Sequence, residues 1–227
     1  MIITKKKDIN AILESLKGKK TVFLFGCNSC AEQCATGGEK EIKEMTAILE
    51  EHGIKVVGSS IPDETCYRQL ILKDYRLKPE LKEAEAVLVL ACGAGVRTVA
   101  DAADETQPVL PALDSLFLAS VERVGRFFEG CSLCGECVLH ITGGICPHTE
   151  CPKGLLNGPC GGVAHGMCEV NIESECAWVR IYKRLEKQGR LHALRNIAAP
   201  KNHSAGTRPR KVLLRESGNS ADKKGRK

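Results

Sequence analysis

Short apolar runs alternate with amphipathic stretches over the first half of the chain. Residues 21–25 and 86–90 are continuous apolar runs, the pattern of strands that are buried on both faces. Residues 39–52 carry apolar side chains three and four positions apart, which predicts an amphipathic helix that ends at Gly53. Weaker signals of the same kinds predict strands at residues 54–58 and 108–113 and helices at residues 79–85 and 95–103.

Strands that are separated by helices predict a parallel sheet. A crossover has to join consecutive parallel strands, and a helix usually provides it and packs on the sheet. We therefore expect residues 1–127 to form an α/β domain, with a Rossmann-like parallel sheet and helices on both of its faces.

The hydrophobic periodicity is lost after residue 127. Glycine, proline and cysteine dominate residues 130–162, and such a segment buries too little apolar surface to offset its ordering entropy. We therefore predict that residues 128–189 form a small cysteine-rich domain that is held together by metal. Its one clear helix, residues 175–187, places four large side chains on one face: Trp178, Ile181, Tyr182 and Leu185.

The chain is rich in cysteine: thirteen of its 227 residues are Cys. The lysine-rich first ten residues precede no long apolar run, so we expect no signal peptide. No run approaches the length of a membrane span either, so we expect no membrane span and a cytoplasmic protein. Cytoplasmic thiols stay reduced, and this many cysteines therefore indicate metal binding or redox chemistry instead of disulfides.

Positive charge is concentrated at the end of the chain. Residues 201–227 carry nine Lys and Arg against two acidic residues, a net charge of +7, whereas the whole chain has +5. We expect residues 190–227 to form a basic, partly disordered tail. This segment has no aromatic side chains, so we favour a solvated or partner-docking tail over nucleic-acid binding.

Five cysteines, here called the first cysteine group, lie in the predicted α/β domain: Cys27, Cys30, Cys34, Cys66 and Cys92. They follow predicted strands, and the carboxyl ends of parallel strands share one edge of the sheet, where ligands bind. Three close cysteines with a remote fourth are typical ligands of a [4Fe-4S] cluster. A zinc site and a group without metal remain alternatives, and Cys66 is our choice for the spare thiol.

Eight cysteines, here called the second cysteine group, follow within 46 residues: Cys131, Cys134, Cys137, Cys146, Cys151, Cys160, Cys168 and Cys176. The first three have the spacing that binds a cubane cluster in bacterial ferredoxins, where a remote Cys-Pro supplies a further ligand. Eight thiols suffice for two clusters, so the chain is predicted to hold one to three [4Fe-4S] clusters. The alternative is zinc in at least one site, with help from a histidine among His140, His148 and His165.

Motifs of hydrolases, P-loop proteins and zinc proteases are absent from the sequence. The loop of residues 92–95 contains only a partial dinucleotide fingerprint, which makes an enzyme with its own nucleotide the weakest hypothesis. Clusters without a substrate motif indicate electron transfer.

Three segments also resemble a known family. They are Cys-Ser-Leu-Cys-Gly-Glu-Cys from residue 131, Thr-Gly-Gly-Ile-Cys-Pro from residue 142 and Cys-Pro-Lys-Gly-Leu-Leu-Asn-Gly-Pro-Cys-Gly-Gly from residue 151. They resemble the methylenetetrahydrofolate reductase C-terminal domain family. Phe-Gly-Cys-Asn-Ser-Cys from residue 25 and Thr-Gly-Gly-Glu from residue 36 resemble the rest of the small subunit in which that domain occurs, often called MetV.

The resemblance implies a role in one-carbon metabolism. In that family the small subunit carries iron–sulfur centres for a flavoprotein methylenetetrahydrofolate reductase, which reduces 5,10-methylenetetrahydrofolate to 5-methyltetrahydrofolate. The resemblance thus predicts an electron-transfer subunit of an oxidoreductase complex, with ferredoxin or an electron-bifurcating unit as donor. The helix with Trp178 and the tail after Pro200 are our candidates for the docking surface. The rival hypothesis is a zinc-stabilised structural adapter of the same flavoprotein without redox turnover.

Overall fold

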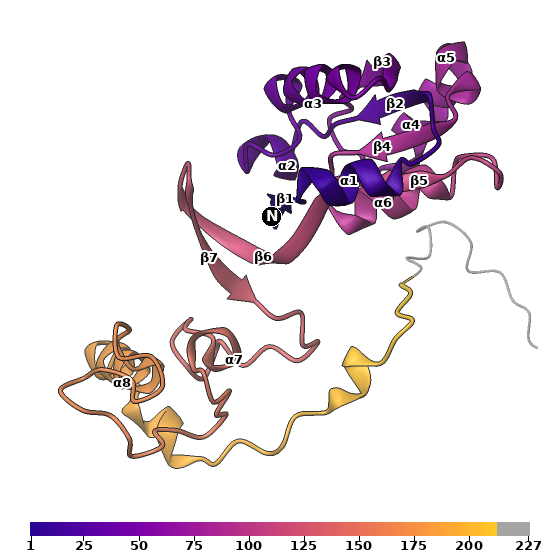
Figure 1. Cartoon of the computed structure of the whole chain (residues 1–227). Helices are drawn as coiled ribbons and strands as arrows, with labels where there is room; N and C mark the ends of the chain where they lie inside the picture. Colours follow the sequence, from indigo (N-terminus) through magenta and orange to yellow (C-terminus); the bar gives the residue numbers. More distant parts are fainter. Residues whose placement is uncertain (213–227) are drawn as a thin grey trace, which may run out of the picture. The chain divides into compact units, whose positions relative to one another are not determined.

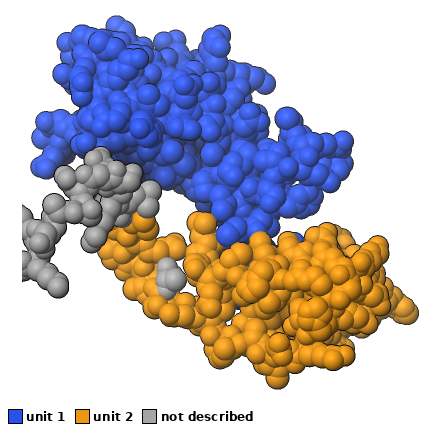
Figure 2. Space-filling model, turned by 180° about the vertical axis from the view of Figure 1, so that it is seen from behind, with its two compact units in different colours: residues 1–132, 146–154 blue, residues 133–145, 155–227 orange. Residues whose placement is uncertain are grey.

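The computed structural model describes residues 1–212 and divides the chain into two compact units (Figure 2). The first unit consists of residues 1–132 and 146–154, and the second of residues 133–145 and the chain from residue 155 onward. The second unit thus takes part of the cysteine-rich segment, while residues 146–154 belong to the first. No helix in residues 1–212 is long and apolar enough to cross a membrane.

A parallel four-stranded sheet forms the centre of the first unit (Figure 1). Its strands are β2 (Thr21–Phe25), β3 (Lys55–Ser60), β4 (Ala86–Val89) and β5 (Val109–Pro111). Their order is β3-β2-β4-β5, and all neighbours run in parallel, which confirms the predicted α/β fold. The chain adds β3 on one side of β2 and then crosses back to add β4 and β5 on the other side. The topological switch point of the sheet therefore lies between β2 and β4.

Helices cover both faces of this sheet, as expected for a parallel sheet (Figure 1). Val22 and Leu24 of β2 are buried with residues of the helices on one face, and Phe23 and Phe25 with residues of those on the other. The first face is covered by α1 (Ile9–Ser15) and α3 (Glu39–Glu51), and the second by α4 (Arg68–Leu77), α5 (Pro79–Glu83) and α6 (Gly93–Ala100). The alternation along β2 explains why the strand is apolar at every position after Thr21.

An antiparallel three-stranded sheet is the part of the first unit that the hydrophobic pattern did not predict. It consists of β1 (Ile2–Lys6), β6 (Leu113–Arg123) and β7 (Arg126–Cys131) in the order β1-β6-β7. The expected strand at residues 108–113 is in fact two: β5 ends at Pro111, and β6 begins at Leu113 in the other sheet. Most side chains of β6 are exposed, and β1 ends in lysines, so neither strand has the apolar pattern of a buried one.

The second unit contains one α-helix within the described residues, α8 (Ala177–Lys187), followed by two 3-10 turns, η1 (Leu191–Arg195) and η2 (His203–Gly206). Trp178 is 5 % exposed, and Ile181 and Leu185 are fully buried. Tyr182 is 48 % exposed, so its predicted place on the apolar face is wrong. Other parts of the chain cover the apolar face of α8. Our suggestion that this face is free to dock a partner is therefore wrong.

Candidate metal centres at the cysteines

Cys27, Cys66 and Cys92 follow β2, β3 and β4 and lie at the carboxyl-terminal edge of the parallel sheet. Cys27 and Cys92 flank the switch point of the sheet, where open α/β folds place their ligands. Partial burial of Cys66, and then the neighbouring thiols of Cys92 and Cys27, raise the pKa of the Cys66 thiol. Thr65 Oγ1 donates to the Gly26 carbonyl at 2.6 Å, and Thr98 Oγ1 of α6 donates to the Cys66 carbonyl at 3.3 Å, so the loops after β2, β3 and β4 contact one another at this edge. Cys66, our choice for the spare thiol, is thus among the cysteines at this edge.

The other two thiols of the first cysteine group face strand β1. They lie on and just after the short helix α2 (Cys30–Gln33). The backbone N–H of Ile2 donates to Cys30 Sγ at 3.4 Å, and Cys34 Sγ lies 3.9 Å from the Ile2 carbonyl oxygen, to which it donates. Two steps along β1, the buried hydroxyls of Thr4 and Thr36 form a hydrogen bond of 2.6 Å. Strand β1 is therefore fixed to the loop that carries Cys30 and Cys34.

A glycine lets this loop lie against the sheet. A Cβ added at Gly37 would lie 1.9 Å from the carbonyl oxygen of Leu90 and 2.9 Å from Cβ of Ala31. The Gly37 carbonyl in turn accepts from the backbone N–H of Cys27 at 2.9 Å. The backbone itself thus holds the α2 loop beside the edge where Cys27 and Cys92 lie.

Sheet β1-β6-β7 connects the first cysteine group to the first residue of the second. Ile2 is paired with Leu118 of β6, and Leu118 is paired with Cys131 at the end of β7. Two strand spacings separate Ile2 from Cys131, which amounts to roughly 10 Å between their Cα atoms. Cys131 therefore lies close, across this sheet, to the strand that contacts Cys30 and Cys34.

The second cysteine group is distributed over both units. Cys131 ends β7, and Cys146 and Cys151 flank the one-turn helix α7 (Pro147–Glu150); all three belong to the first unit. The members that belong to the second unit are Cys134, Cys137, Cys160, Cys168 and Cys176.

Polar groups contact two of the sulfurs in the second unit. Cys160 Sγ donates to Glu169 Oε1 at 3.4 Å. Lys201 Nζ donates to Cys134 Sγ at 2.8 Å. Cys176 precedes α8 as its N-terminal cap residue, with its backbone N–H bonded to the Gly166 carbonyl.

The chemistry of these side chains fits thiolate ligation. All thirteen cysteines are free thiols, and N–H or ammonium donors point at Cys30 and Cys134. Donors of this kind favour a sulfur that bears negative charge, and they surround cluster ligands in iron–sulfur proteins. Among residues 1–212, however, no three Cys, His, Asp or Glu side chains are close enough to hold one metal ion. The assignment of cysteines to individual centres therefore stays a prediction.

The nucleotide hypothesis loses its main sequence argument. A Cβ at Gly95 would lie 2.9 Å from Cβ of Ala91 and 3.3 Å from the Thr65 side chain, so helix packing alone accounts for this glycine. The backbone N–H of Gly93, at the start of α6, already donates to Ser115 Oγ at 2.9 Å.

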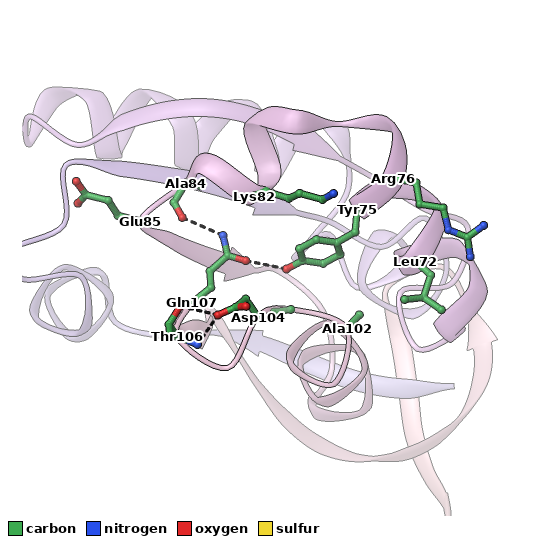
Figure 3. Close-up of a pocket in the computed structure, with 11 residues that line it drawn as sticks. Leu72, Tyr75, Arg76, Lys82, Ala84, Glu85, Ala102, Asp104, Thr106 and Gln107 are labelled. Atoms are coloured by element: carbon green, nitrogen blue, oxygen red, sulfur yellow. Dashed lines mark hydrogen bonds between the residues drawn. The ribbon is translucent and has the colours of Figure 1, made fainter.

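A cavity of about 810 Å³ lies at the opposite, amino-terminal edge of the sheet (Figure 3). Tyr75, 8 % exposed, donates from its hydroxyl to Gln107 Oε1 at 3.1 Å, and Gln107 Nε2 donates to the carbonyls of Leu81 and Ala84. Burial raises the pKa of Tyr75 to about 12. No cysteine lines the cavity, which is therefore separate from the candidate metal centres.

The comparisons with known proteins concern the C-terminal half. Neither the curated proteins nor the solved structures gave a match to this chain. A family model described as methylene-tetrahydrofolate reductase C terminal matches residues 110–204, less than half of the chain. The match begins in β5 and includes the β6–β7 hairpin, all eight members of the second cysteine group, α8 and η1. It confirms the resemblance seen in the sequence: residues 110–204 match the methylenetetrahydrofolate reductase C-terminal domain family.

Proposed function

We propose that this chain is the electron-transfer subunit of a methylenetetrahydrofolate reductase complex. The observation that carries the proposal is the family match, which covers the segment with all eight cysteines of the second group. In the proposed complex a flavoprotein partner holds the flavin and the folate and reduces 5,10-methylenetetrahydrofolate to 5-methyltetrahydrofolate. The present chain contributes the cysteines.

Iron–sulfur clusters supply one-electron chemistry when bound, and we propose one to three [4Fe-4S] clusters as the cofactors of this chain. The all-thiol donor set and the donors at Cys30 and Cys134 support this assignment. Cys27, Cys66 and Cys92 at the carboxyl-terminal edge of the sheet are the proposed core of the first centre, with Cys30 or Cys34 as a further ligand. This proposal replaces our choice of Cys66 as the spare thiol. Zinc also binds thiolates, so the identity of the metal is the first question for experiment.

The short connection through the antiparallel sheet supports transfer between centres. Roughly 10 Å separate Ile2, which contacts Cys30 and Cys34, from Cys131. Electrons that enter at the first cysteine group would have a short path to Cys131, the first member of the second group. An external donor, such as ferredoxin or an electron-bifurcating unit, would supply them, and the flavoprotein would receive them.

The tail remains the candidate for docking to the flavoprotein. The apolar face of α8 is buried, so only the tail remains of our two candidates. Residues 213–227, which contain five of its positive charges, lie outside the described part of the chain. Deletion after Pro200 should weaken co-purification with the flavoprotein, and unchanged co-purification would contradict the docking role.

A zinc-stabilised adapter is the second candidate function. Within the described residues, the second unit buries few large apolar side chains, chiefly Trp178, Ile181 and Leu185 of α8, together with Ile145. A unit with so small a core needs a staple, and zinc can provide one without any redox role.

Metal analysis of the full chain, purified without oxygen, separates the two functions. We expect iron and acid-labile sulfide in equal amounts, and an electron paramagnetic resonance (EPR) signal after reduction with dithionite. Addition of the reduced chain to the oxidised flavoprotein should then bleach the flavin. Stoichiometric zinc with almost no iron would refute electron transfer and favour the adapter.

A matched pair of variants tests the ligands. Cys131→Ala should lose the iron of one centre, because it removes a proposed ligand at the end of β7. Ser132→Ala alters the adjacent, exposed residue and should keep the full iron content. Equal iron contents in both variants would contradict the assignment of Cys131.

A further inference from the structure

A basic segment of the second unit folds back over the loop that presents Cys134. We call residues 201–210 the strap and residues 133–136 the Cys134 loop. Besides its bond to Cys134 Sγ, Lys201 Nζ donates to the Glu136 carbonyl. The backbone N–H of Asn202 donates to Glu136 Oε2 at 2.9 Å, and Arg210 Nη1 donates to the Leu133 carbonyl at 3.0 Å. The strap therefore binds the Cys134 loop on both sides of the cysteine.

The Cys134 loop has a backbone conformation that depends on such support. Leu133 has a φ of 55° and Gly135 a φ of 86°, so left-handed residues precede and follow the cysteine. Leucine rarely adopts this conformation, and a strained residue persists only where surrounding contacts hold it. The bond from Arg210 to the Leu133 carbonyl is one of these contacts.

Lys201 is placed differently from an ordinary surface lysine. It is half-buried, and its ammonium lies 2.8 Å from a half-buried sulfur. A charged donor at this distance binds a sulfur more strongly as the sulfur becomes more negative. The contact therefore favours electron-rich states of whatever centre Cys134 binds.

We propose that Lys201 is a positioning residue that holds Cys134 and raises the reduction potential of the metal centre to which Cys134 contributes. This inference rests on the proposed function, and it assigns a role to a residue outside the cysteine pattern. Reduction adds one electron and one negative charge to the centre. The positive charge of Lys201 stabilises the reduced state of the centre more than the oxidised state. The strap thus uses Lys201 and Arg210 within the chain itself, before any partner binds.

The test is a potentiometric titration of the iron-loaded full chain, followed by EPR. The relevant signal is the one that disappears in Cys134→Ala, and the signals of other centres are internal references. Lys201→Met removes the donor and should lower the equilibrium constant for reduction of this centre about tenfold. For a one-electron couple this is a shift of ~59 mV to lower potential. Lys201→Arg keeps a charged donor and should restore most of the shift.

Lys211→Met is the matched control, because Lys211 is an exposed lysine next to the strap and its loss changes the net charge equally. Its potential should equal that of the wild type. An unchanged potential in iron-loaded Lys201→Met would overturn the inference. If Lys201→Met does not retain the centre, the Lys201→Gln variant, which keeps an uncharged donor, is titrated instead. An unchanged potential in Lys201→Gln would overturn the inference, and so would loss of the centre in that variant.

These outcomes are separate from a failure of the proposed function. A wild-type chain without iron refutes electron transfer, and this inference with it. Iron-loaded variants with equal potentials refute only the role of Lys201.

Discussion

Ile181→Ala is expected to lower the free energy of unfolding of the second unit by about 3 kcal/mol. Ile181 is fully buried on α8, on the same face as Trp178 and Leu185. The truncation removes buried apolar surface and leaves a cavity, and Ile→Ala changes at such positions cost about 2–5 kcal/mol. We choose the lower half of this range because the neighbouring loops can partly collapse into the space.

Trp178 provides the assay, since it is the only tryptophan of the chain and is 5 % exposed. Its fluorescence should report unfolding of the second unit in urea. A small unit has a denaturant slope of about 1 kcal/mol per M, so a loss of about 3 kcal/mol lowers the midpoint by about 3 M. Wild type and variant have to carry the same metal, because bound metal stabilises the folded state.

Tyr182→Ala is the control for this comparison, because Tyr182 follows Ile181 on the same helix and is 48 % exposed. Its midpoint should move by less than about 0.5 M, since surface changes cost about 0.5 kcal/mol or less. Equal midpoints for Ile181→Ala and Tyr182→Ala would refute the burial of this face. The apolar face of α8 would then be available to a partner, as the sequence alone had indicated.

Three further predictions concern the first unit and the metal. Burial raises the pKa of Tyr75 to about 12, from about 10 in the unfolded chain, so the free energy of unfolding is highest below pH 10 and falls by about 2 kcal/mol as the pH rises towards 12. Urea titrations at pH 9 and 11 should show a smaller loss of stability for Tyr75→Phe than for the wild type, and an equal loss would contradict this. Gly37→Ala should lower the free energy of unfolding by about 1–3 kcal/mol or more, because its Cβ would overlap the Leu90 carbonyl oxygen. In thermal unfolding, the control Gly206→Ala should lower it far less, because open space surrounds Gly206. Removal of the metal by chelation should accelerate proteolysis within residues 155–176, which have no fully buried apolar side chain, and unchanged cleavage there would show that metal does not hold this segment.

The parallel sheet could be predicted because its strands are buried on both faces. Residues 22–25 and 86–90 are apolar at every position, and the structure places β2 and β4 there, side by side. Strands β1, β6 and β7 could not be predicted in the same way. They form a sheet with largely exposed side chains, and their pairing depends on backbone hydrogen bonds that leave no apolar pattern in the sequence.

The candidate centres were predictable as a set of cysteines but not as an arrangement. Spacing shows that Cys27, Cys30 and Cys34 are close along the chain, yet Cys30 and Cys34 contact β1. The Cys66 carbonyl accepts from Thr98 Oγ1 of α6, the helix that begins after Cys92, although 26 positions separate the two cysteines. Strand order, and not sequence distance, decides which loops meet. The contact of Lys201 with Cys134 spans 67 positions, and the only trace of it in the sequence is a basic segment.

The pairing of Ile2 with Leu118 and of Leu118 with Cys131 bears on how this protein can tolerate mutation. Backbone hydrogen bonds set the separation of these three positions, so exchange of exposed side chains on β6 and β7 leaves that separation unchanged. Insertion or deletion of a single residue between Leu118 and Cys131 shifts the register and turns Cys131 to the other face of the sheet. Related sequences should therefore vary freely in the composition of this hairpin while its length stays constant.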